Sequence, residues 1–204
     1  MAAKLLIAFY SRNGSTEALA NAVAEGARAA GAEVRVRRVR DIVGPEVMAQ
    51  APGWAENSAR MQAEYPAPTT DDCEWADGIV FGAPTRFGII AAELKAFIDS
   101  LGGLWFGGKL FNKVGAAFGA TATTHGGAES TLLGLFAAMS HLGLVIVPNG
   151  YGDPATFAAG TPYGSHTAVD GQHVKAPAET DLAVARYQGK RVAQVAATLA
   201  ALRG

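Results

Sequence analysis

The chain has 204 residues, of which 50% are hydrophobic and 17% are charged, and its formal net charge is −1. This hydrophobic fraction excludes an intrinsically disordered chain, because burial of so much apolar surface offsets the entropy lost on folding. The near-neutral charge, without a run of lysines or arginines, argues against a nucleic-acid partner. The length predicts one domain over residues 1–204.

Cysteine content and hydropathy indicate the compartment. The single cysteine, Cys73, excludes an internal disulfide, a CxxC pair and a thiolate metal site, and this fits a reducing cytoplasm. The apolar run in residues 1–10 is too short for a signal peptide, and glycines and polar residues interrupt the apolar stretch 132–148. We therefore expect a cytoplasmic protein with no membrane insertion.

The first third of the chain predicts a strand, a helix and a strand. Residues 4–10 are continuously apolar, as in a strand buried on both faces of a parallel sheet. Residues 16–30 have apolar side chains at helical spacing and end at Gly31. Residues 34–37 alternate between valine and arginine, which is typical of an edge strand.

The rest of the chain continues this alternation after an irregular segment. Residues 41–72 contain four prolines and only a weak helical pattern. Buried strands are then predicted at 78–82, 114–118 and 144–148, and helices at 91–101, 129–142 and 179–202, with a glycine- and proline-rich loop over 149–177 before the last helix.

Alternating strands and helices predict an α/β fold with a parallel sheet covered on both faces. The edge character of the second strand indicates a flavodoxin-like, doubly wound, five-stranded parallel sheet with strand order 2-1-3-4-5. In such sheets, ligands bind beyond the carboxyl ends of the strands.

The loop after the first strand carries hydroxyl side chains and a glycine where a helix begins: Ser11, Arg12, Asn13, Gly14, Ser15 and Thr16. The first turn of a helix has unpaired N–H groups and a partial positive charge, so this loop is suited to bind a phosphate. The absence of GxxxxGK[ST] and GxGxxG argues against nucleoside triphosphate and Rossmann dinucleotide sites. The alternative is that these residues form only a turn and a helix cap.

The loop after the next central strand comprises Pro84, Thr85, Arg86, Phe87 and Gly88. Proline stiffens the backbone, glycine permits close approach, and the Arg-Phe pair offers a cation and an aromatic edge to a flat ring. The alternative is an ordinary strand–helix turn in which Arg86 is solvated.

A third loop again combines hydroxyls with glycine before a helix: Ala120, Thr121, Ala122, Thr123, Thr124, His125 and Gly126. Its alternative is a flexible connection. Because all three loops must lie at one edge of one sheet, they predict a phosphate cage beside two backbone clamps for a planar ring. Flavin mononucleotide (FMN) has this shape.

Five motifs occur along the chain: Tyr-Ser-Arg-Asn-Gly-Ser-Thr, Gly-Ala-Pro-Thr-Arg-Phe-Gly, Leu-Gly-Gly-Leu-Trp, Gly-Thr-Pro-Tyr-Gly and Ala-Arg-Tyr-Gln-Gly. Together they resemble the WrbA family of flavodoxin-like NAD(P)H:quinone oxidoreductases. The resemblance runs from residue 4 to about residue 202. The second and third motifs in combination are more specific than any one loop, since electron-carrier flavodoxins lack that pair.

The resemblance implies an FMN cofactor, NADH or NADPH as co-substrate, a small-molecule quinone as substrate and a homotetramer. It implies that residues 11–16 hold the FMN phosphate, and that residues 84–88 and 120–126 hold the isoalloxazine and ribityl groups. It also implies that Asn13 lies where the nicotinamide nucleotide approaches, that Trp105 lines the substrate pocket and that His141 reaches the flavin region. In the family, some of these residues come from a neighbouring subunit.

Some of these residues have structural alternatives. Trp105 could be packed in a core or interface, although its glycine-rich surroundings favour a pocket or interface. His141 could be a histidine at a helix end, where positive charge is favourable. The other histidines lack metal-ligand spacing, so no metal site is expected. The chain departs from the family in two places. The loop 120–127 is longer and less glycine-rich than is usual, which affects the FMN contacts of its individual residues. The segment 151–160 is short, which affects the contacts between subunits.

The flavin carries the chemistry, so no catalytic side chain is expected. We expect NAD(P)H to deliver a hydride to the flavin and leave, and a quinone to take its place and accept two electrons, with ping-pong kinetics. The alternatives are a flavodoxin-like electron carrier and a cofactor-free interaction module. Oxidation of NAD(P)H by the pure protein distinguishes the enzyme from both.

Overall fold

The computed structural model describes residues 2–169 and 176–203. In this part of the chain, a parallel sheet has the order β2-β1-β3-β5-β6. Its strands are β1 (Lys4–Phe9), β2 (Glu33–Arg38), β3 (Gly78–Arg86), β5 (Val114–Thr121) and β6 (Val145–Ile146). This confirms the predicted flavodoxin-like fold and strand order. Two short strands add to the sheet: β4 (Ile89–Ile90) is antiparallel to β3, and β7 (His166–Ala168) is parallel to β5.

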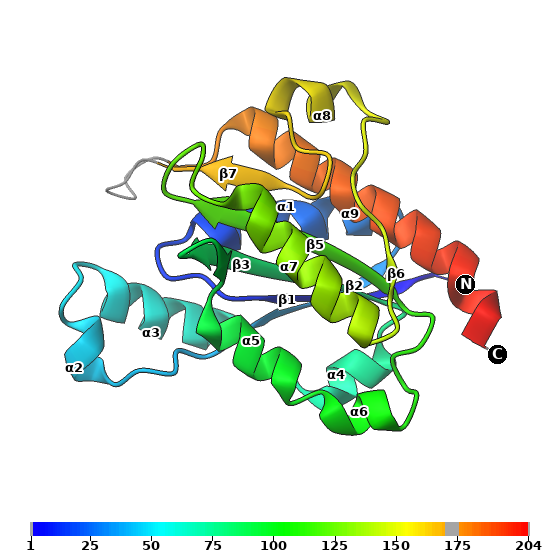
Figure 1. The fold of residues 1–204 in the computed structure, drawn as a ribbon, viewed down its shortest axis with the longest axis horizontal. Helices are drawn as coiled ribbons and strands as arrows, with labels where there is room; N and C mark the ends of the chain where they lie inside the picture. Colours follow the sequence, from blue (N-terminus) through cyan, green and yellow to red (C-terminus); the bar gives the residue numbers. More distant parts are fainter. Residues whose placement is uncertain (1, 170–175, 204) are drawn as a thin grey trace.

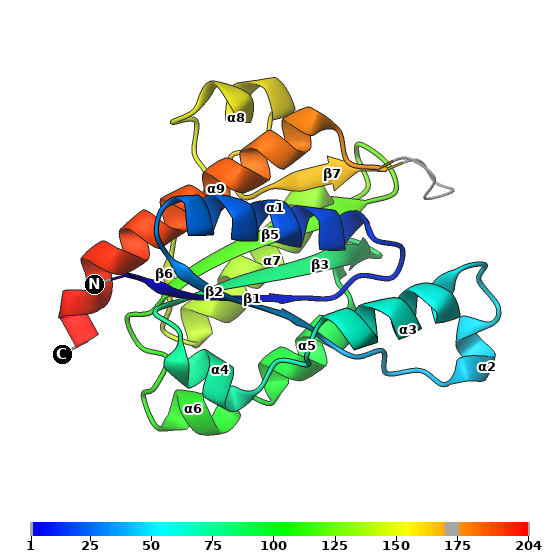
Figure 2. The same ribbon diagram turned by 180° about the vertical axis from the view of Figure 1, so that it is seen from behind.

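Helices cover both faces of the sheet (Figures 1 and 2). The helices α1 (Ser15–Ala29) and α9 (Glu179–Leu199) lie on one face, and α5 (Ala92–Asp99) and α7 (Ala128–His141) lie on the other. The shorter helices are α2 (Pro45–Met48), α3 (Trp54–Glu64), α4 (Thr70–Trp75), α6 (Gly102–Phe106) and α8 (Pro154–Ala159), and the 3-10 helix η1 (Ala200–Arg203) follows α9. The helices α2 and α3 extend past the strand ends, at the left of Figure 1.

The central strand β1 supplies both hydrophobic cores. Leu5, Ile7 and Phe9 belong to the core beneath α1 and α9, whereas Leu6 and Ala8 belong to the core beneath α5 and α7. All five side chains are fully buried. A strand with two buried faces is continuously apolar, which is why the sequence pattern identified this strand.

The helices α1 and α9 cross in backbone contact. A methyl group at Gly26 would overlap the carbonyl oxygen of Arg186, and a methyl group at Gly189 would overlap that of Val23. The two glycines therefore allow α9 to lie closer to α1 than any side chain would permit.

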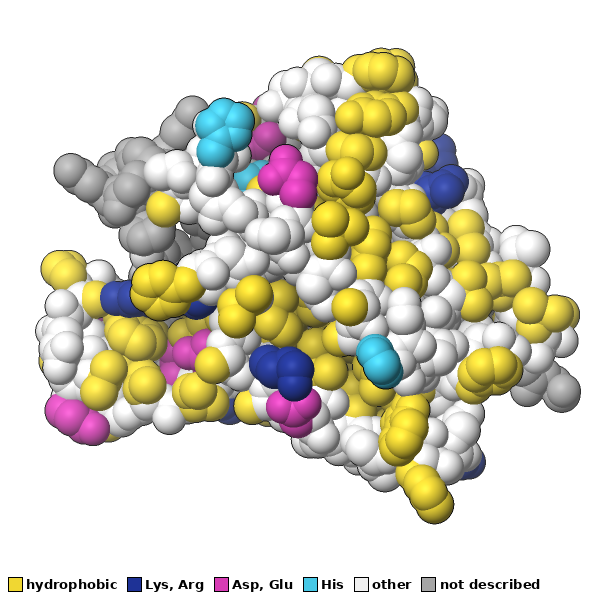
Figure 3. Space-filling view, viewed as in Figure 1, with side chains coloured by type: hydrophobic (Ala, Val, Ile, Leu, Met, Phe, Trp, Pro, Cys, Tyr) yellow, Lys and Arg dark blue, Asp and Glu magenta, His cyan; other side chains and the backbone are white. Residues whose placement is uncertain are grey.

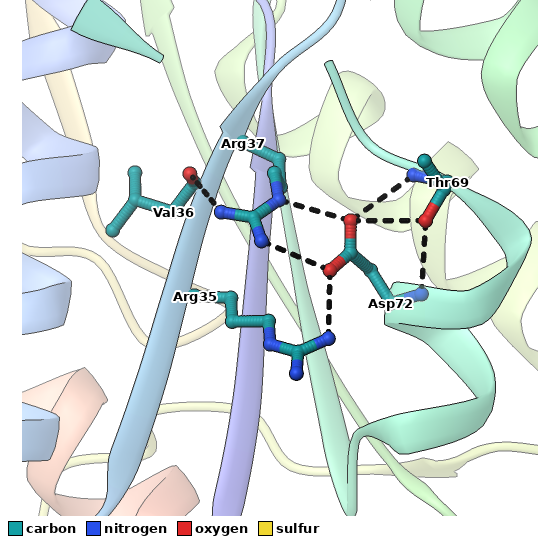
Figure 4. A network of polar contacts seen from close by, with 5 residues as sticks. All are labelled: Arg35, Val36, Arg37, Thr69 and Asp72. Carbon is teal, nitrogen blue, oxygen red and sulfur yellow. Dashed lines mark hydrogen bonds and ion pairs between the residues drawn. The ribbon is translucent and has the colours of Figure 1, made fainter. Parts of the chain in front are cut away.

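The edge strand β2 is joined to α4 by one buried carboxylate (Figure 4). Asp72 accepts hydrogen bonds from Arg35 at 3.0 Å and from Arg37 at 2.9 and 3.1 Å. It also caps α4 reciprocally with Thr69. The segment 41–72, where only a weak helical pattern is present in the sequence, thus contains α2, α3 and the start of α4. The capping box and the arginine pairs hold α4 in place.

The outer edge of β5 is divided between two strands. β6 pairs with the start of β5 at Val114 and Gly115, and β7 pairs with its end from Gly119 to Thr121. The predicted strand 144–148 is therefore shorter than expected. The predicted loop 149–177 was wrong in part, because it contains α8 and β7. The sequence pattern did not predict β7, because a strand of three residues is too short to show an apolar periodicity and is held in place by its neighbours.

No helix within the described ranges is both long and apolar enough to cross a membrane.

The contact between α1 and α9 generates a stability prediction. Gly26→Ala and Gly189→Ala should each lower the free energy of unfolding by about 2 kcal/mol or more, because the added methyl forces the helices apart. Gly103→Ala in α6 is the control, since an added methyl there meets no atom within 4 Å. Urea unfolding measures the difference, and wild-type stability in both crossing variants would contradict it.

Candidate cofactor site

A cavity of about 320 Å³ lies at the carboxyl ends of β1, β3 and β5, where the fold places ligands. This volume is within the range of small-molecule sites, about 300–1,000 Å³. Residues from all three predicted loops line it: Ser11, Arg12, Asn13, Ser15, Thr16, Pro84, Thr85, Arg86, Phe87, Ala120, Thr121 and Ala122, together with Val169. The structure thus brings the three loops to one cavity, which we call the strand-end pocket.

The first loop presents the amino end of α1 to this pocket. Gly14 precedes the helix with a φ of 94°, in the left-handed region that favours glycine. No side chain caps the helix, and the hydroxyl of Ser11 accepts a hydrogen bond from the Gly14 N–H at 3.1 Å. The first turn of a helix of 15 residues therefore keeps N–H groups that an anion can occupy.

A buried polar cluster supports the first loop from below. Asp41 accepts hydrogen bonds from four side chains at 2.6–2.8 Å: Tyr10, Arg38, Trp54 and Ser58. Arg38 is fully buried and also donates to the Ser11 carbonyl at 3.0 Å. The cluster fixes the backbone at the start of the loop.

Burial alone would raise the pKa of Asp41, but the hydrogen bonds from its four donors outweigh burial and hold this pKa below its usual value. Burial, followed by the charges of Glu93 and Asp41, raises the pKa of Tyr10. Asp41 is therefore ionised and Tyr10 protonated at neutral pH. The sequence analysis missed this cluster, because its members are dispersed over residues 10–58 and share no motif.

Arginine side chains occur in the first loop and around the end of β2. The Arg12 guanidinium stacks on the Trp54 ring at 4.0 Å from its centroid. Buried nitrogens of Arg12, Arg38 and Arg40 have no hydrogen-bond partner within the described structure. Figure 3 shows Lys and Arg side chains next to hydrophobic ones at this side of the molecule. Of these three side chains only Arg12 lines the strand-end pocket, and its guanidinium beside the uncapped start of α1 fits a phosphate group.

Residues 84–86 of the second predicted loop are the end of β3, and Phe87 and Gly88 form the turn between β3 and β4. Phe87 has a φ of 51°, which is unusual for a bulky side chain, and the ring is fully exposed. Ser130 donates a hydrogen bond to the Gly88 carbonyl at 2.8 Å, and the hydroxyls of Thr85 and Thr131 are 2.9 Å apart. The start of α7 therefore holds this strained turn at the mouth of the pocket.

The third loop contributes less of the pocket wall than expected. Ala120 and Thr121 are the last residues of β5, and with Ala122 they line the pocket. Thr123, His125 and Gly126 do not line it, and Thr124 lines a second cavity of about 320 Å³ beside His166. The contacts predicted for residues 123–126 thus remain predictions.

Two predicted residues lie elsewhere in the chain. Trp105 and His141 line a separate hollow between α5, α6 and α7. The structure brings them together, but it does not bring them to the strand-end pocket of the same chain. The described residues contain no group of three or more side chains arranged to hold a metal ion.

Arg12, Ser15 and Thr16 line the strand-end pocket at the start of α1, and Pro84, Phe87 and Ala122 line it near the ends of β3 and β5. Hydroxyls and a guanidinium at a helix start suit a phosphate, and the two strand ends offer backbone to a flat ring, so the residues present fit FMN.

Comparisons with known proteins agree with this arrangement. A family model described as NADPH-dependent FMN reductase matches residues 4–154. The chain is 47% identical to a protein of Azorhizobium caulinodans named NAD(P)H dehydrogenase (quinone), over 97% of this chain and 98% of that protein. It is 43% identical to a protein of Rhizobium rhizogenes with the same name, over 98% and 100% of the two chains.

Solved structures extend the likeness to the fold. A WrbA-like flavodoxin from Agrobacterium tumefaciens superposes with a TM-score of 0.67 and 25% identity, over 97% of this chain and 99% of that chain. An archaeal flavodoxin superposes with a TM-score of 0.60 at 18% identity, over 95% and 99% of the two chains.

The Asp41 cluster generates a prediction with a defined pH dependence. Asp41→Asn should destabilise the protein by on the order of 3 kcal/mol at pH 7, because Arg38 then lacks its buried counter-charge. The lowered pKa of Asp41 means that its contribution is present above the unfolded-state pKa and is lost as the pH falls through the folded-state pKa. Urea unfolding of both proteins between pH 7 and pH 3 should show the difference shrink, and a constant difference would contradict this.

Proposed function

The chain belongs to the NADPH-dependent FMN reductase family, and we propose that it is an FMN-dependent NAD(P)H:quinone oxidoreductase. The predicted relationship to the WrbA family is confirmed by the full-length relatives and by the WrbA-like structure. The single observation that carries the proposal is the strand-end pocket, which joins an uncapped helix start with unpaired guanidinium N–H groups to two turns suited to a flat ring. The electron carrier and the cofactor-free module are not favoured, because the relatives over nearly the full length are named as dehydrogenases.

We infer that the first loop binds the FMN phosphate through the backbone N–H groups at the start of α1 and the hydroxyls of Ser15 and Thr16. Arg12 adds positive charge, and its stacking on Trp54 orients the guanidinium. Arg38 keeps the Ser11 carbonyl turned inward, which leaves the N–H side of the loop for the phosphate.

The second and third loops hold the ring. When bound, FMN accepts a hydride from NAD(P)H and passes two electrons to a quinone. Backbone N–H groups of these loops would stabilise negative charge that bound FMN gains on reduction. The exposed Phe87 turn borders the pocket, and we propose that NAD(P)H and quinone occupy the same place there in turn. Ping-pong kinetics are therefore proposed.

We further propose a homotetramer in which another copy of the chain completes the substrate pocket. The exposed side of α7 is apolar in its middle, where Leu133, Gly134 and Ala137 are exposed between Ser130 and Ser140. Phe106 on α6 and Phe157 on α8 are also exposed, and Figure 3 shows hydrophobic side chains gathered over these three helices. An apolar surface of this kind is suited to subunit contacts.

Subunit contact would also give Trp105 and His141 a role. Both lie beside the apolar face, outside the strand-end pocket of their own chain. We propose that they approach the pocket of a neighbouring subunit, with Trp105 at the substrate and His141 near the flavin, and that Asn13 meets the nicotinamide nucleotide.

A cytoplasmic location is proposed on the state of the single cysteine. Cys73 is the single cysteine of the sequence, so the chain forms no internal disulfide, and burial raises the pKa of its thiol to about 12.

Flavin reduction tests the enzymatic proposal. The purified protein is loaded with FMN, freed of excess and titrated anaerobically with NADH and then NADPH. At least one nucleotide should bleach the visible flavin bands, and adding a quinone should restore them. Riboflavin, which lacks the phosphate, should bind about tenfold more weakly or worse, since charge-assisted hydrogen bonds are lost. Bound flavin that neither nucleotide bleaches would support the carrier instead.

Sedimentation tests the proposed assembly. The wild-type chain should sediment as a tetramer at micromolar concentration, and Leu133→Asp should shift it to smaller species, because a carboxylate would be buried against apolar surface. Leu202→Asp is the matched control, since Leu202 is an exposed leucine of η1, away from the apolar face. A wild-type monomer, or tetramers of both variants, would contradict the proposed contact.

A further inference from the structure

Hydrogen bonds between its own residues hold the third loop in a closed turn. The Thr121 hydroxyl donates to the Thr123 carbonyl at 2.8 Å, and the Gly126 N–H donates to the same carbonyl at 3.0 Å. A methyl group at Gly126 would lie 2.9 Å from the Thr123 hydroxyl and 3.2 Å from the Thr121 Cβ. The loop is thus a tight turn built on Thr121, which itself lines the pocket.

The proton positions at Thr121 follow from its single hydroxyl hydrogen. Because Thr121 donates this hydrogen to a carbonyl, it can only accept from the ring nitrogen Nε2 of His166, which lies 3.0 Å away. Neutral His166 therefore carries its proton on Nε2. Burial lowers the pKa of His166 even though Asp181 and Glu129 act to raise it, so the neutral ring prevails at pH 7 and its tautomer matters.

The strand β7 fixes the position of this imidazole. The Ser165 carbonyl accepts from the Gly119 N–H at 2.9 Å, and the Val169 N–H donates to the Thr121 carbonyl at 2.9 Å. Ser165 is held in turn by the buried amide of Gln188, which it contacts at 2.6 and 3.1 Å. The ring is presented to Thr121 from a strand whose two ends are both hydrogen-bonded to β5.

These contacts lead from α9 through β7 to the pocket wall. We propose that His166 is a positioning residue for FMN: by donating Nε2–H to the Thr121 hydroxyl, it holds the third loop in the shape that receives the cofactor. The inference rests on the proposed function, because it concerns the same pocket. His166 does not line the pocket itself, so it acts only through Thr121.

Two amide variants separate the hydrogen bond from general packing. The amide nitrogen of glutamine reaches the place of Nε2, whereas that of the shorter asparagine reaches only the place of Nδ1. His166→Gln should keep the FMN dissociation constant within about twofold of wild type. His166→Asn should raise it five- to tenfold, the size of one lost hydrogen bond. Quenching of FMN fluorescence gives both constants, and near-UV circular dichroism checks that both variants fold.

A second readout does not depend on the cofactor. In the apoprotein, amide hydrogen exchange over residues 122–127 should be faster in His166→Asn than in wild type and unchanged in His166→Gln. Thr121→Val removes the hydroxyl that His166 contacts, and it should make a further His166→Asn substitution without effect on exchange.

The outcomes distinguish this inference from the proposed function. Equal FMN affinity and equal exchange in wild type and His166→Asn would overturn the inference, and so would equal losses in the glutamine and asparagine variants. A wild-type protein that binds no FMN would overturn the proposed function, whereas the exchange data would still decide whether His166 holds the loop.

Discussion

One buried amide, Gln188, determines where the last part of the chain meets the sheet. Its oxygen accepts from the N–H and hydroxyl of Ser165, and its nitrogen donates to the Ala117 carbonyl at 2.7 Å. The side chain is fully buried, so each of these bonds forms where water cannot replace it. A methyl group at Gly164 would overlap the Ala117 carbonyl, so this glycine admits the backbone beside β5. The Gln188 contacts and the backbone pairing of β7 with β5 together set the position of β7, and with it the pocket wall at Thr121.

Two motifs that first served only as signs of family resemblance thereby gain physical roles. Gly-Thr-Pro-Tyr-Gly ends at Gly164, where the chain passes against β5. Ala-Arg-Tyr-Gln-Gly contains Gln188, which ties β7 to β5, and Gly189, which brings α9 onto α1. These two adjacent residues of α9 thus contact different neighbours: Gln188 contacts β5, and Gly189 contacts α1. The last helix is therefore a structural support for the pocket as well as a cover for the sheet.

A second buried polar cluster, around Asp41, supports the first loop. The sequence analysis expected a cage of N–H groups and hydroxyls, and the structure adds a layer of arginines centred on Asp41. Arg38, the arginine that pairs with Asp41, also holds the Ser11 carbonyl, so this cluster joins the loop to the strands beneath it. The stacking of Arg12 on Trp54 places an aromatic residue from α3 in the same layer. The extended segment α2–α3 is thereby linked to the cofactor site rather than being a surface insertion.

Local patterns by themselves determined the sheet, its strand order and the three loops at its carboxyl edge. The reason is that a strand buried on both faces must be continuously apolar, and parallel neighbours need helical crossovers. The tertiary structure alone decided the place of β7, the Asp41 cluster and the separation of Trp105 and His141 from the pocket of their own chain. Each depends on contacts between residues far apart in sequence, such as Gln188 with Ala117 or Asp41 with Tyr10, and no periodicity or motif records such pairs.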